Sequence, residues 1–289
     1  MFLTGASGFI GGYFYKTYFA DYDIVPISLR KQTVGSLDFK DVEAVVHCAA
    51  LVHQMEGAPA ELYFKINRDL TLELARRAKM ERVKHFVFLS TSHVFGDSGQ
   101  VKDHDKIWSS QDECHPLDPY GQSKLEAEKG LLELANEGFK VSILRPPMVY
   151  GPGAKGNIIQ LAKLIRKFRV LPLGYLKNRR SLIFIGNLCF YIKCLIEEPK
   201  TGIFLPQDEK PLSIGEICEA IAQAMNQNLT LLPLPNLVIW VAEKFTPSIA
   251  YRLFGTLAFA NDPWLEKFER LTSTQEGFQR SFAPRNKEG

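Results

Sequence analysis

Short apolar runs alternate with amphipathic stretches through the first half of this chain. Residues 61–79 carry apolar side chains at helical spacing, and residues 123–137 also have the pattern of a helix. Because strands that alternate with helices need crossover connections, this pattern predicts a parallel sheet covered by helices. The runs with the length of buried strands are residues 1–3, 23–29, 43–50, 85–90 and 141–144.

The alternation weakens after about residue 151. Helices are predicted there at residues 158–168 and 213–226, and Ser213 with Glu216 has the spacing of a capping box. The change of pattern predicts an α/β domain over residues 1–150. A smaller lobe is expected over residues 151–289, with some of its chain returning to the sheet.

Composition excludes several classes of protein. The chain has 289 residues, of which 46% are hydrophobic and 23% charged, as in ordinary soluble globular proteins. Its net charge of +3 argues against a nucleic-acid-coating protein but leaves room for a local phosphate site. No uninterrupted apolar stretch reaches about 18 residues, so we expect no membrane-spanning helix.

The five cysteines have irregular spacing and no CxxC pair. They indicate reduced thiols in a cytoplasmic protein, and neither a disulfide framework nor a metal site is expected. The apolar start is broken by Gly5, Ser7 and Gly8, so no secretory signal peptide is predicted.

A glycine-rich loop, "TGASGFIGG", follows the first predicted strand and precedes a helix. Glycines let the backbone approach a diphosphate, and a helix N-terminus attracts its negative charge. The order strand, loop, helix therefore predicts a Rossmann-type, doubly wound sheet that binds a dinucleotide, although a tight turn is the alternative. The expected cofactor residues of this loop are Gly5, Ser7, Gly8, Phe9, Ile10 and Gly11.

The residues after the second predicted strand bear on the choice of cofactor. An NAD-binding protein usually has an acid here, whereas this chain has Arg30 and Lys31. Because an arginine can accommodate a 2′-phosphate, Arg30 favours NADP (as NADPH), and NAD remains the alternative. The alternative interpretation is that Arg30 and Lys31 belong to a solvent-exposed turn that binds no cofactor.

Six stretches together resemble one known family. They are "TGASGFIGG", "VVHCAALVHQM", "FVFLSTSHVFGD", "PYGQSKLEAE", "LRPPMVYGPGAKGN" and "NRRSLIFIGNL". In this order they resemble the extended short-chain dehydrogenase/reductase family, in its nucleotide-sugar epimerase and reductase branch. Within the branch the chain is most similar to bacterial UDP-hexosamine 4-ketoreductases and C4-epimerases.

The resemblance implies a catalytic set of three residues. Tyr120 would be the acid/base, Lys124 would lower its pKa and bind the nicotinamide ribose, and Thr91 would bond the C4 oxygen of the sugar. A free tyrosine has a pKa near 10, and a nearby cation favours the phenolate. Without the family pattern, Tyr120 and Lys124 would be a half-buried tyrosine beside a surface lysine.

The resemblance also implies contacts with cofactor and substrate. Cys48, Ala49 and Ala50 would line the cofactor at a strand end, and Pro146 would lie near the nicotinamide. The expected substrate residues are Ser92, His93, Asn157 and Arg180, although each could be an ordinary solvated side chain. An arginine fork at position 180 suits the geometry of a diphosphate.

Some positions depart from the family pattern. Ser92 and His93 replace the two acids of the branch's dehydratases, which argues against dehydration. Met148 and Gly186 replace an asparagine and an aspartate that many sugar epimerases have. The segment 30–41 is short, so a helix between the second and third strands is expected to be missing, which weakens the NADP argument.

These observations predict an NAD(P)-dependent enzyme that acts at C4 of a UDP-linked hexose or hexosamine. A 4-ketoreductase is favoured over an NAD-dependent C4-epimerase, and a non-catalytic cofactor sensor is less favoured. The substrate would be the nucleotide sugar bound by the C-terminal lobe, and a homodimer is left open. The apolar segment 231–245, with Trp240, fits burial in this lobe better than a membrane-surface helix.

Overall fold

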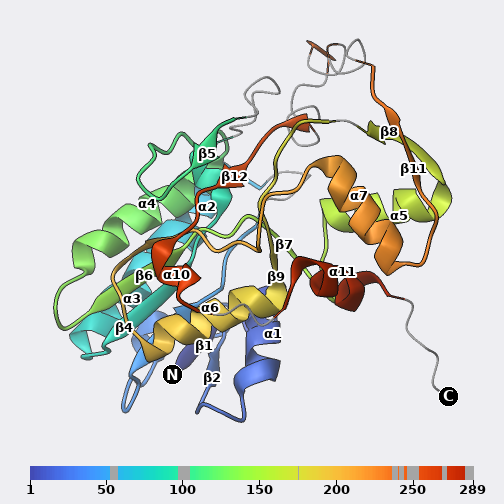
Figure 1. Cartoon of the computed structure of the whole chain (residues 1–289). Coiled ribbons are helices and arrows are strands. Elements are labelled where there is room, and N and C mark those ends of the chain that lie inside the picture. Colours follow the sequence, from blue (N-terminus) through green and yellow to red (C-terminus); the bar gives the residue numbers. More distant parts are fainter. Residues whose placement is uncertain are drawn as a thin grey trace. The chain divides into compact units, whose positions relative to one another are not determined.

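The computed structural model describes residues 1–52, 58–96, 105–174, 176–235, 240, 244–245, 254–268 and 272–283 (Figure 1). The chain forms two compact units, and it passes between them several times. The first unit comprises Met1–Gly96, Ser110–Pro146 and Cys189–Pro206. The second comprises Asp97–Ser109, Pro147–Leu188 and Gln207–Gly289. Residues 53–55 of the "VVHCAALVHQM" stretch lie outside the described residues.

The first unit is built on a six-stranded sheet with the order β10-β6-β4-β3-β1-β2, in which every neighbouring pair is parallel. The predicted parallel α/β sheet is therefore confirmed. β2 and β3 lie on opposite sides of β1, so the carboxyl ends of β1 and β3 flank a topological switch point. The strands are β1 (Phe2–Thr4), β2 (Val25–Ile27), β3 (Ala44–His47), β4 (His85–Leu89), β6 (Lys140–Leu144) and β10 (Gly202–Phe204).

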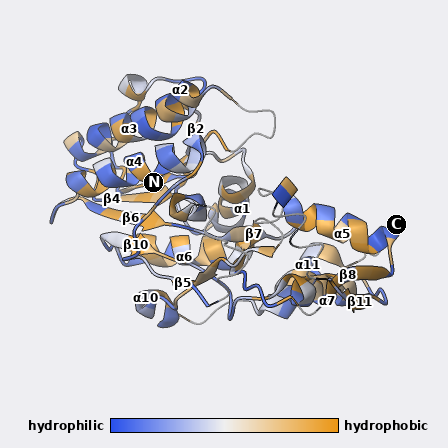
Figure 2. Cartoon of the chain, turned by 90° about the horizontal axis from the view of Figure 1, so that it is seen from above, coloured by the Kyte–Doolittle hydropathy of each residue, from blue (hydrophilic) through white to orange (hydrophobic). Residues whose placement is uncertain are grey.

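Helices of the first unit cover both faces of this sheet (Figures 1 and 2). On one face, α3 (Leu70–Met80) and α4 (Pro119–Leu134) bury an apolar cluster against the strands. On the other face lie α1 (Phe9–Tyr18) and the second half of α6 (Ile185–Glu197). Since both faces are covered, the central strands are continuous apolar runs rather than alternating ones.

The long helix expected at residues 61–79 is not a continuous α-helix, because its central part is π-helical. α2 (Ala60–Tyr63) leads into a π-helical segment, η2 (Phe64–Asp69), before α3 begins. The apolar spacing at residues 61–79 gave no sign of this segment. Such segments are rare and frequently lie at functional sites.

The connection between β2 and β3 lacks an α-helix, as expected from its length. Residues 28–43, all of them described, contain only the short 3₁₀ turn η1 (Val34–Ser36). Val34, Leu37 and Phe39 are buried in the same apolar cluster as α3. Side chains from a short loop thus pack against the sheet at this edge.

The second unit combines three pairs of parallel strands with helices. The predicted helices at 158–168 and 213–226 correspond to α5 and α7, and the capping box of Ser213 and Glu216 is present. The strand pairs are β5 (Ile107–Trp108) with β12 (Ala258–Phe259), β7 (Met148–Tyr150) with β9 (Leu182–Phe184), and β8 (Val170–Gly174) with β11 (Thr230–Pro233). The helices are α5 (Asn157–Lys167), α7 (Ile214–Ala224), α10 (Pro263–Glu266) and α11 (Thr274–Phe282).

Two described residues of the apolar segment around Trp240 are exposed, whereas burial was expected. Trp240 is 54% exposed and Phe245 is 70% exposed, and the ammonium of Lys244 lies 5.3 and 5.7 Å from their ring centroids. The rest of residues 236–250 is outside the described residues. Among the described helices, none has both the length and the apolar character needed to cross a bilayer.

Candidate active site

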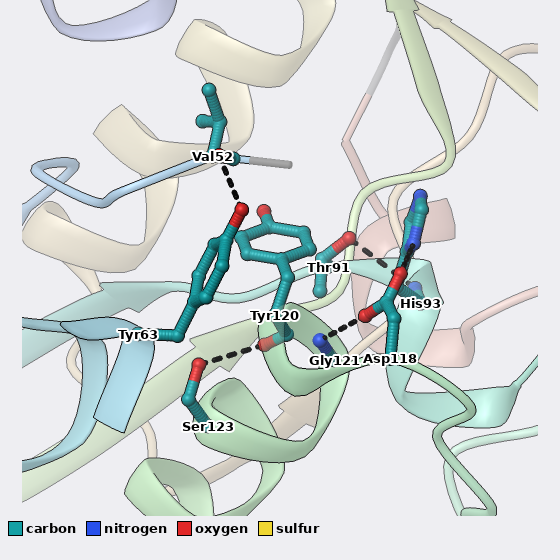
Figure 3. A network of polar contacts seen from close by, with 8 residues as sticks. All are labelled: Val52, Tyr63, Thr91, His93, Asp118, Tyr120, Gly121 and Ser123. Carbon is teal, nitrogen blue, oxygen red and sulfur yellow. Dashed lines mark hydrogen bonds and ion pairs between the residues drawn. The ribbon is translucent and has the colours of Figure 1, made fainter. Parts of the chain in front are cut away.

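Tyr120 and Lys124 lie on one face at the start of α4. The helix begins at Pro119, earlier than expected, because the Asp118 carboxylate caps it by accepting a hydrogen bond from the Gly121 amide at 2.6 Å. Ser123 donates its hydroxyl to the Tyr120 carbonyl at 2.8 Å. Tyr120 therefore lies in a first turn whose backbone is fixed by two side chains (Figure 3).

Lys124 is almost completely buried. Its ammonium donates to the Leu89 carbonyl at 2.6 Å and lies 4.1 Å from the centroid of the Phe88 ring. Burial lowers the pKa of Lys124 to about 7, although Glu128 and Cys48 act in the opposite direction. Both protonation states are therefore accessible near neutral pH.

Thr91 stands beside the Tyr120 hydroxyl at the end of β4 (Figure 3). It begins the 3₁₀ turn η3 (Ser92–Phe95), where its Oγ1 accepts from the His93 amide at 3.2 Å. Burial raises the pKa of Tyr120 to about 12, whereas its hydrogen bond with Thr91 lowers it. Asp118 and Tyr63 raise this pKa slightly further.

The effect of Lys124 on the pKa of Tyr120 stays a prediction. Among the described groups, the hydrogen bond with Thr91 lowers the pKa of Tyr120. The Lys124 ammonium is instead directed at the Leu89 carbonyl. The motif correctly brings the two residues to one helix face but does not reveal this competing acceptor.

Two aromatic rings meet the Tyr120 ring edge-on. The centroid of Tyr63 is 6.4 Å away and that of His93 is 5.5 Å away. His93 Nδ1 lies 3.3 Å from an Asp118 oxygen, and the Tyr63 hydroxyl is 3.5 Å from the Val52 carbonyl (Figure 3). His93 thus lies against the tyrosine ring, and its contact with a substrate stays a prediction.

Sequence reasoning missed Tyr63 and Asp118. The signal for Asp118 was present, because aspartate followed by proline is a common start of a helix. No comparable signal marks Tyr63, which is the last residue of α2 before the π-helical segment.

The strand ends around Thr91 are held by buried polar contacts. Ser92, which is buried, donates its amide to the Pro146 carbonyl at 3.1 Å. Ser90 donates its hydroxyl to Glu128, which forms a buried ion pair with Arg145 at 2.6 Å. These contacts connect β4, α4 and the residues that follow β6, next to Thr91.

The glycine loop has a shape that larger residues could not adopt. Gly5 has a φ of +73°, and a Cβ atom there would lie 2.7 Å from the Ala49 nitrogen. A Cβ on Gly11 would lie 2.4 Å from the Gly5 oxygen. The loop consequently packs closely against both the end of β3 and the first turn of α1.

The loop residues fit a dinucleotide diphosphate. Gly8 is the N-cap of α1, and no side chain caps this helix and no acid lies in its first turn. Ser7 and Gly8 are exposed, and Phe9 and Ile10 begin the helix half-buried. The amides of this first turn are therefore available for a phosphate, as at other dinucleotide-binding loops.

Residues after β3 lie directly beside this loop. Cys48, Ala49 and Ala50 are half-buried, and the Ala49 amide donates to Thr4 Oγ1 at 3.1 Å. Asn67 of η2 forms hydrogen bonds with both the amide and the carbonyl of Leu51, at 2.8 and 3.0 Å. The backbone that would face the cofactor is thus fixed from two sides.

His47 connects these contacts from inside the protein. Thr71 donates to the Asn67 carbonyl, so its oxygen accepts from His47 Nε2 at 3.0 Å. Nδ1 is then the acceptor for the Thr4 hydroxyl at 2.8 Å. Burial lowers the pKa of His47 to about 3, which keeps the ring neutral in this arrangement.

The remaining predicted residues are not joined to this group by described contacts. Arg30 is exposed in the turn after β2, at the edge strand next to β1. Asn157 is the exposed first residue of α5 in the second unit. Arg180 is half-buried in the same unit, and its backbone pairs with Leu212 and Leu257. Their roles in binding stay predictions.

Comparisons with known proteins agree with this architecture. The model of the NAD dependent epimerase/dehydratase family matches residues 1–204. A UDP-glucose 4-epimerase of Vibrio cholerae is 35% identical over 297 residues, which cover 94% of this chain and 85% of that protein.

Two solved structures have the same fold. The UDP-glucuronic acid 4-epimerase from Bacillus cereus in complex with NAD gives a TM-score of 0.74 at 18% identity, covering 97% of this chain and 96% of its own. The dTDP-4-dehydrorhamnose reductase from Bacillus anthracis in complex with NADP gives 0.74 at 22% identity, covering 97% of each chain. Because one holds NAD and the other NADP, they do not decide the cofactor of this protein.

Proposed function

The chain belongs to the NAD dependent epimerase/dehydratase family, and we propose on that premise that it is a C4-epimerase of a UDP-linked hexose or hexosamine. The observation that carries this proposal is the 35% identity with a UDP-glucose 4-epimerase across most of both chains. The sequence pattern alone favoured a reductase. We give epimerisation precedence because this relative matches 94% of the chain.

The proposed roles of the residues rest on the family resemblance and on the positions of the side chains. The Tyr120 oxygen would exchange a proton with the C4 hydroxyl of the sugar, and the Thr91 hydroxyl would hold the same oxygen in place. When bound, the nicotinamide cofactor supplies hydride exchange at C4. Lys124 would bind the nicotinamide ribose with the donors that the Leu89 carbonyl leaves available.

A direct assay tests this proposal. The purified protein is incubated with UDP-glucose and with UDP-N-acetylglucosamine, and the products are separated and identified by NMR. We expect conversion to the C4 epimer without net consumption of cofactor. Tyr120→Phe should lower the rate by about 10²–10⁴-fold, the usual contribution of general acid/base catalysis. Absence of any epimer with either sugar would reject epimerisation of these two substrates.

A 4-ketoreductase is the second candidate, and Arg30 favours it. The guanidinium of Arg30 suits the 2′-phosphate of NADPH, and a reductase needs fresh NADPH in every cycle. In this case Tyr120 would donate its proton to the C4 oxygen of a UDP-4-keto sugar. Oxidation of NADPH that depends on the keto sugar, with no epimer formed from UDP-glucose, would establish the reductase instead.

The second unit contributes the proposed contacts with the nucleotide sugar. Arg180 would pair with the diphosphate, since a guanidinium fork matches phosphate geometry, and Asn157 would contact the sugar or a phosphate. Support comes from the match of "KGN" and "NRRS" to the family pattern.

A further inference from the structure

The second unit contains an unusually basic segment. Between residues 151 and 180 there are eight lysines or arginines and no aspartate or glutamate, in a chain whose net charge is only +3. Lys163, Lys167 and Arg169 of this segment are exposed on α5 and at the start of β8. Among the described residues, no carboxylate forms an ion pair with any of these three.

Apolar side chains are exposed in the same place. Leu164 and Phe168 are 38% and 45% exposed, and they lie one turn apart because the Phe168 amide donates to the Leu164 carbonyl at 2.9 Å. Val170, the first residue of β8, follows two residues later and is 50% exposed.

The neighbouring strand adds a fourth apolar residue. β11 pairs with β8 so that Leu231 lies beside Leu171, which is buried. Leu232, the next residue, lies where the register of this pair shifts, and it is 48% exposed. We call Lys163, Leu164, Lys167, Phe168, Val170 and Leu232 the basic apolar strip.

The surroundings of the strip also contain acids, on the helix packed behind it. α7 carries Glu216 and Glu219, and it contacts both α5 and β8. Glu216 is engaged in the capping box with Ser213. The apolar face of α5 that contacts the protein carries Ile158, Ala162 and Ile165, which leaves the lysines on the outer face. Figure 2 shows hydrophilic and hydrophobic residues side by side along α5.

We propose that the basic apolar strip docks on the surface of a bilayer that contains anionic phospholipids. Lysines are attracted to anionic headgroups, and aromatic and aliphatic side chains enter the boundary with the acyl chains. The Lys167 ammonium lies 5.2 Å from the Phe168 ring centroid, as in side chains that place a cation and an apolar group at one interface. An acidic soluble partner would use the charges but would leave the four apolar residues unexplained.

A second group of residues in the same unit also combines exposed aromatic rings with a lysine. Trp240 and Phe245 are exposed, and Lys244 lies between 5 and 6 Å from both ring centroids. Tryptophan is enriched at membrane interfaces because its ring is amphipathic. This second group supports a lipid surface as the occupant independently of the strip.

Sedimentation with vesicles tests the proposal. The whole protein is mixed with vesicles of phosphatidylcholine alone, or of phosphatidylcholine with phosphatidylglycerol, at low and at high salt. We expect binding only to the anionic vesicles and a decrease at high salt. The double variant Lys163→Ala/Lys167→Ala should weaken binding about 25-fold, at about fivefold per lysine, and Phe168→Ala should weaken it roughly fivefold.

A matched control removes the same charge elsewhere. Lys16 and Lys40 are exposed in the first unit, so Lys16→Ala/Lys40→Ala should bind like the unchanged protein. Circular dichroism shows whether each variant is folded, and the single variant Lys167→Ala replaces the double one if that does not fold. Equal weakening by both double variants, or absence of binding to anionic vesicles, overturns the proposal. Self-association of the protein that Phe168→Ala abolishes would overturn it too, because the strip would then bind a second copy.

Discussion

At the scale of single residues, the hydroxyl of Thr91 takes part in two hydrogen bonds. Its oxygen accepts from the His93 amide, and its hydrogen bond with Tyr120 opposes the effect of burial on the tyrosine. The proton-transfer properties of Tyr120 therefore depend on a residue that lies at the end of a different element.

Thr91→Val should change both rate and pH dependence. Loss of the hydroxyl removes a group that lowers the pKa of Tyr120, so the pH at which activity is half-maximal should move upward. Turnover should fall by about 10²-fold or more, as when a positioned donor is removed. Initial rates measured across pH check this, and Thr91→Ser should restore most of both. An unchanged pH profile would mean that Thr91 only caps η3.

Arg30 bears on the cofactor. If the protein is the reductase of the second candidate function, one arginine contact with a 2′-phosphate should contribute about 1.5–3 kcal/mol, so NADPH should bind about ten-fold or more tightly than NADH. Arg30→Ala should remove most of this difference without weakening NADH, as measured by calorimetry. Arg76→Ala, at another exposed arginine, is the matched control. Tighter binding of NADH to the unchanged protein would exclude a preference for NADPH.

At the scale of elements, the start of α4 determines where Tyr120 points. Asp118 caps this helix, contacts His93 and raises the pKa of Tyr120. The capping of α4 by Asp118 and the effect of its negative charge can be tested separately, because asparagine caps a helix about as well as aspartate does.

Asp118→Ala and Asp118→Asn should differ in stability. Alanine loses the cap and should lower the free energy of unfolding by about 1 kcal/mol, whereas asparagine should retain nearly all of it. Both remove the negative charge, so both should lower the pKa of Tyr120 and move the activity profile to lower pH. Urea unfolding and rates across pH distinguish the two effects. If asparagine destabilises as much as alanine, Asp118 stabilises α4 through its charge.

The elements also show how far the sequence could be interpreted. Buried strands such as β3 and β4 were predicted because short apolar runs of this length are typical of buried strands. The start of α4 was placed four residues late, since apolar spacing begins only after Pro119. The burial of Lys124 was not foreseeable, because its partner, the Leu89 carbonyl, is a backbone atom that any sequence would supply.

At the scale of the whole molecule, two buried histidines make the fold sensitive to acid. Burial lowers the pKa of His47 to about 3 and that of His85 to about 4. In the unfolded chain both take up a proton below about pH 6.5, whereas in the folded chain they stay neutral until much lower pH. Stability is therefore present above pH 6.5 and is lost as the pH falls below it.

Unfolding by urea at several pH values measures this loss. Between about pH 6 and pH 5, each histidine should lower the free energy of unfolding by up to about 1.4 kcal/mol per pH unit. His85→Gln keeps a donor toward Ser142 and should remove its share of the slope. His115→Gln, at an exposed histidine, is the control and should leave the slope unchanged. A slope unaffected by His85→Gln would assign the acid sensitivity to other groups.

The late position of β10 in the chain has a consequence for biosynthesis. β6 ends at Leu144, but the strand that covers its outer edge is β10, which ends at Phe204. At ribosomal speeds of about 5–20 residues per second, the intervening 60 residues take about 3–12 s to emerge. During this interval a nascent chain offers an uncovered strand edge, which is a template for association with other chains. A gene fragment that stops near residue 150 would lack β10, so the outer edge of β6 would stay uncovered. The first unit can therefore not be produced by ending the gene after β6.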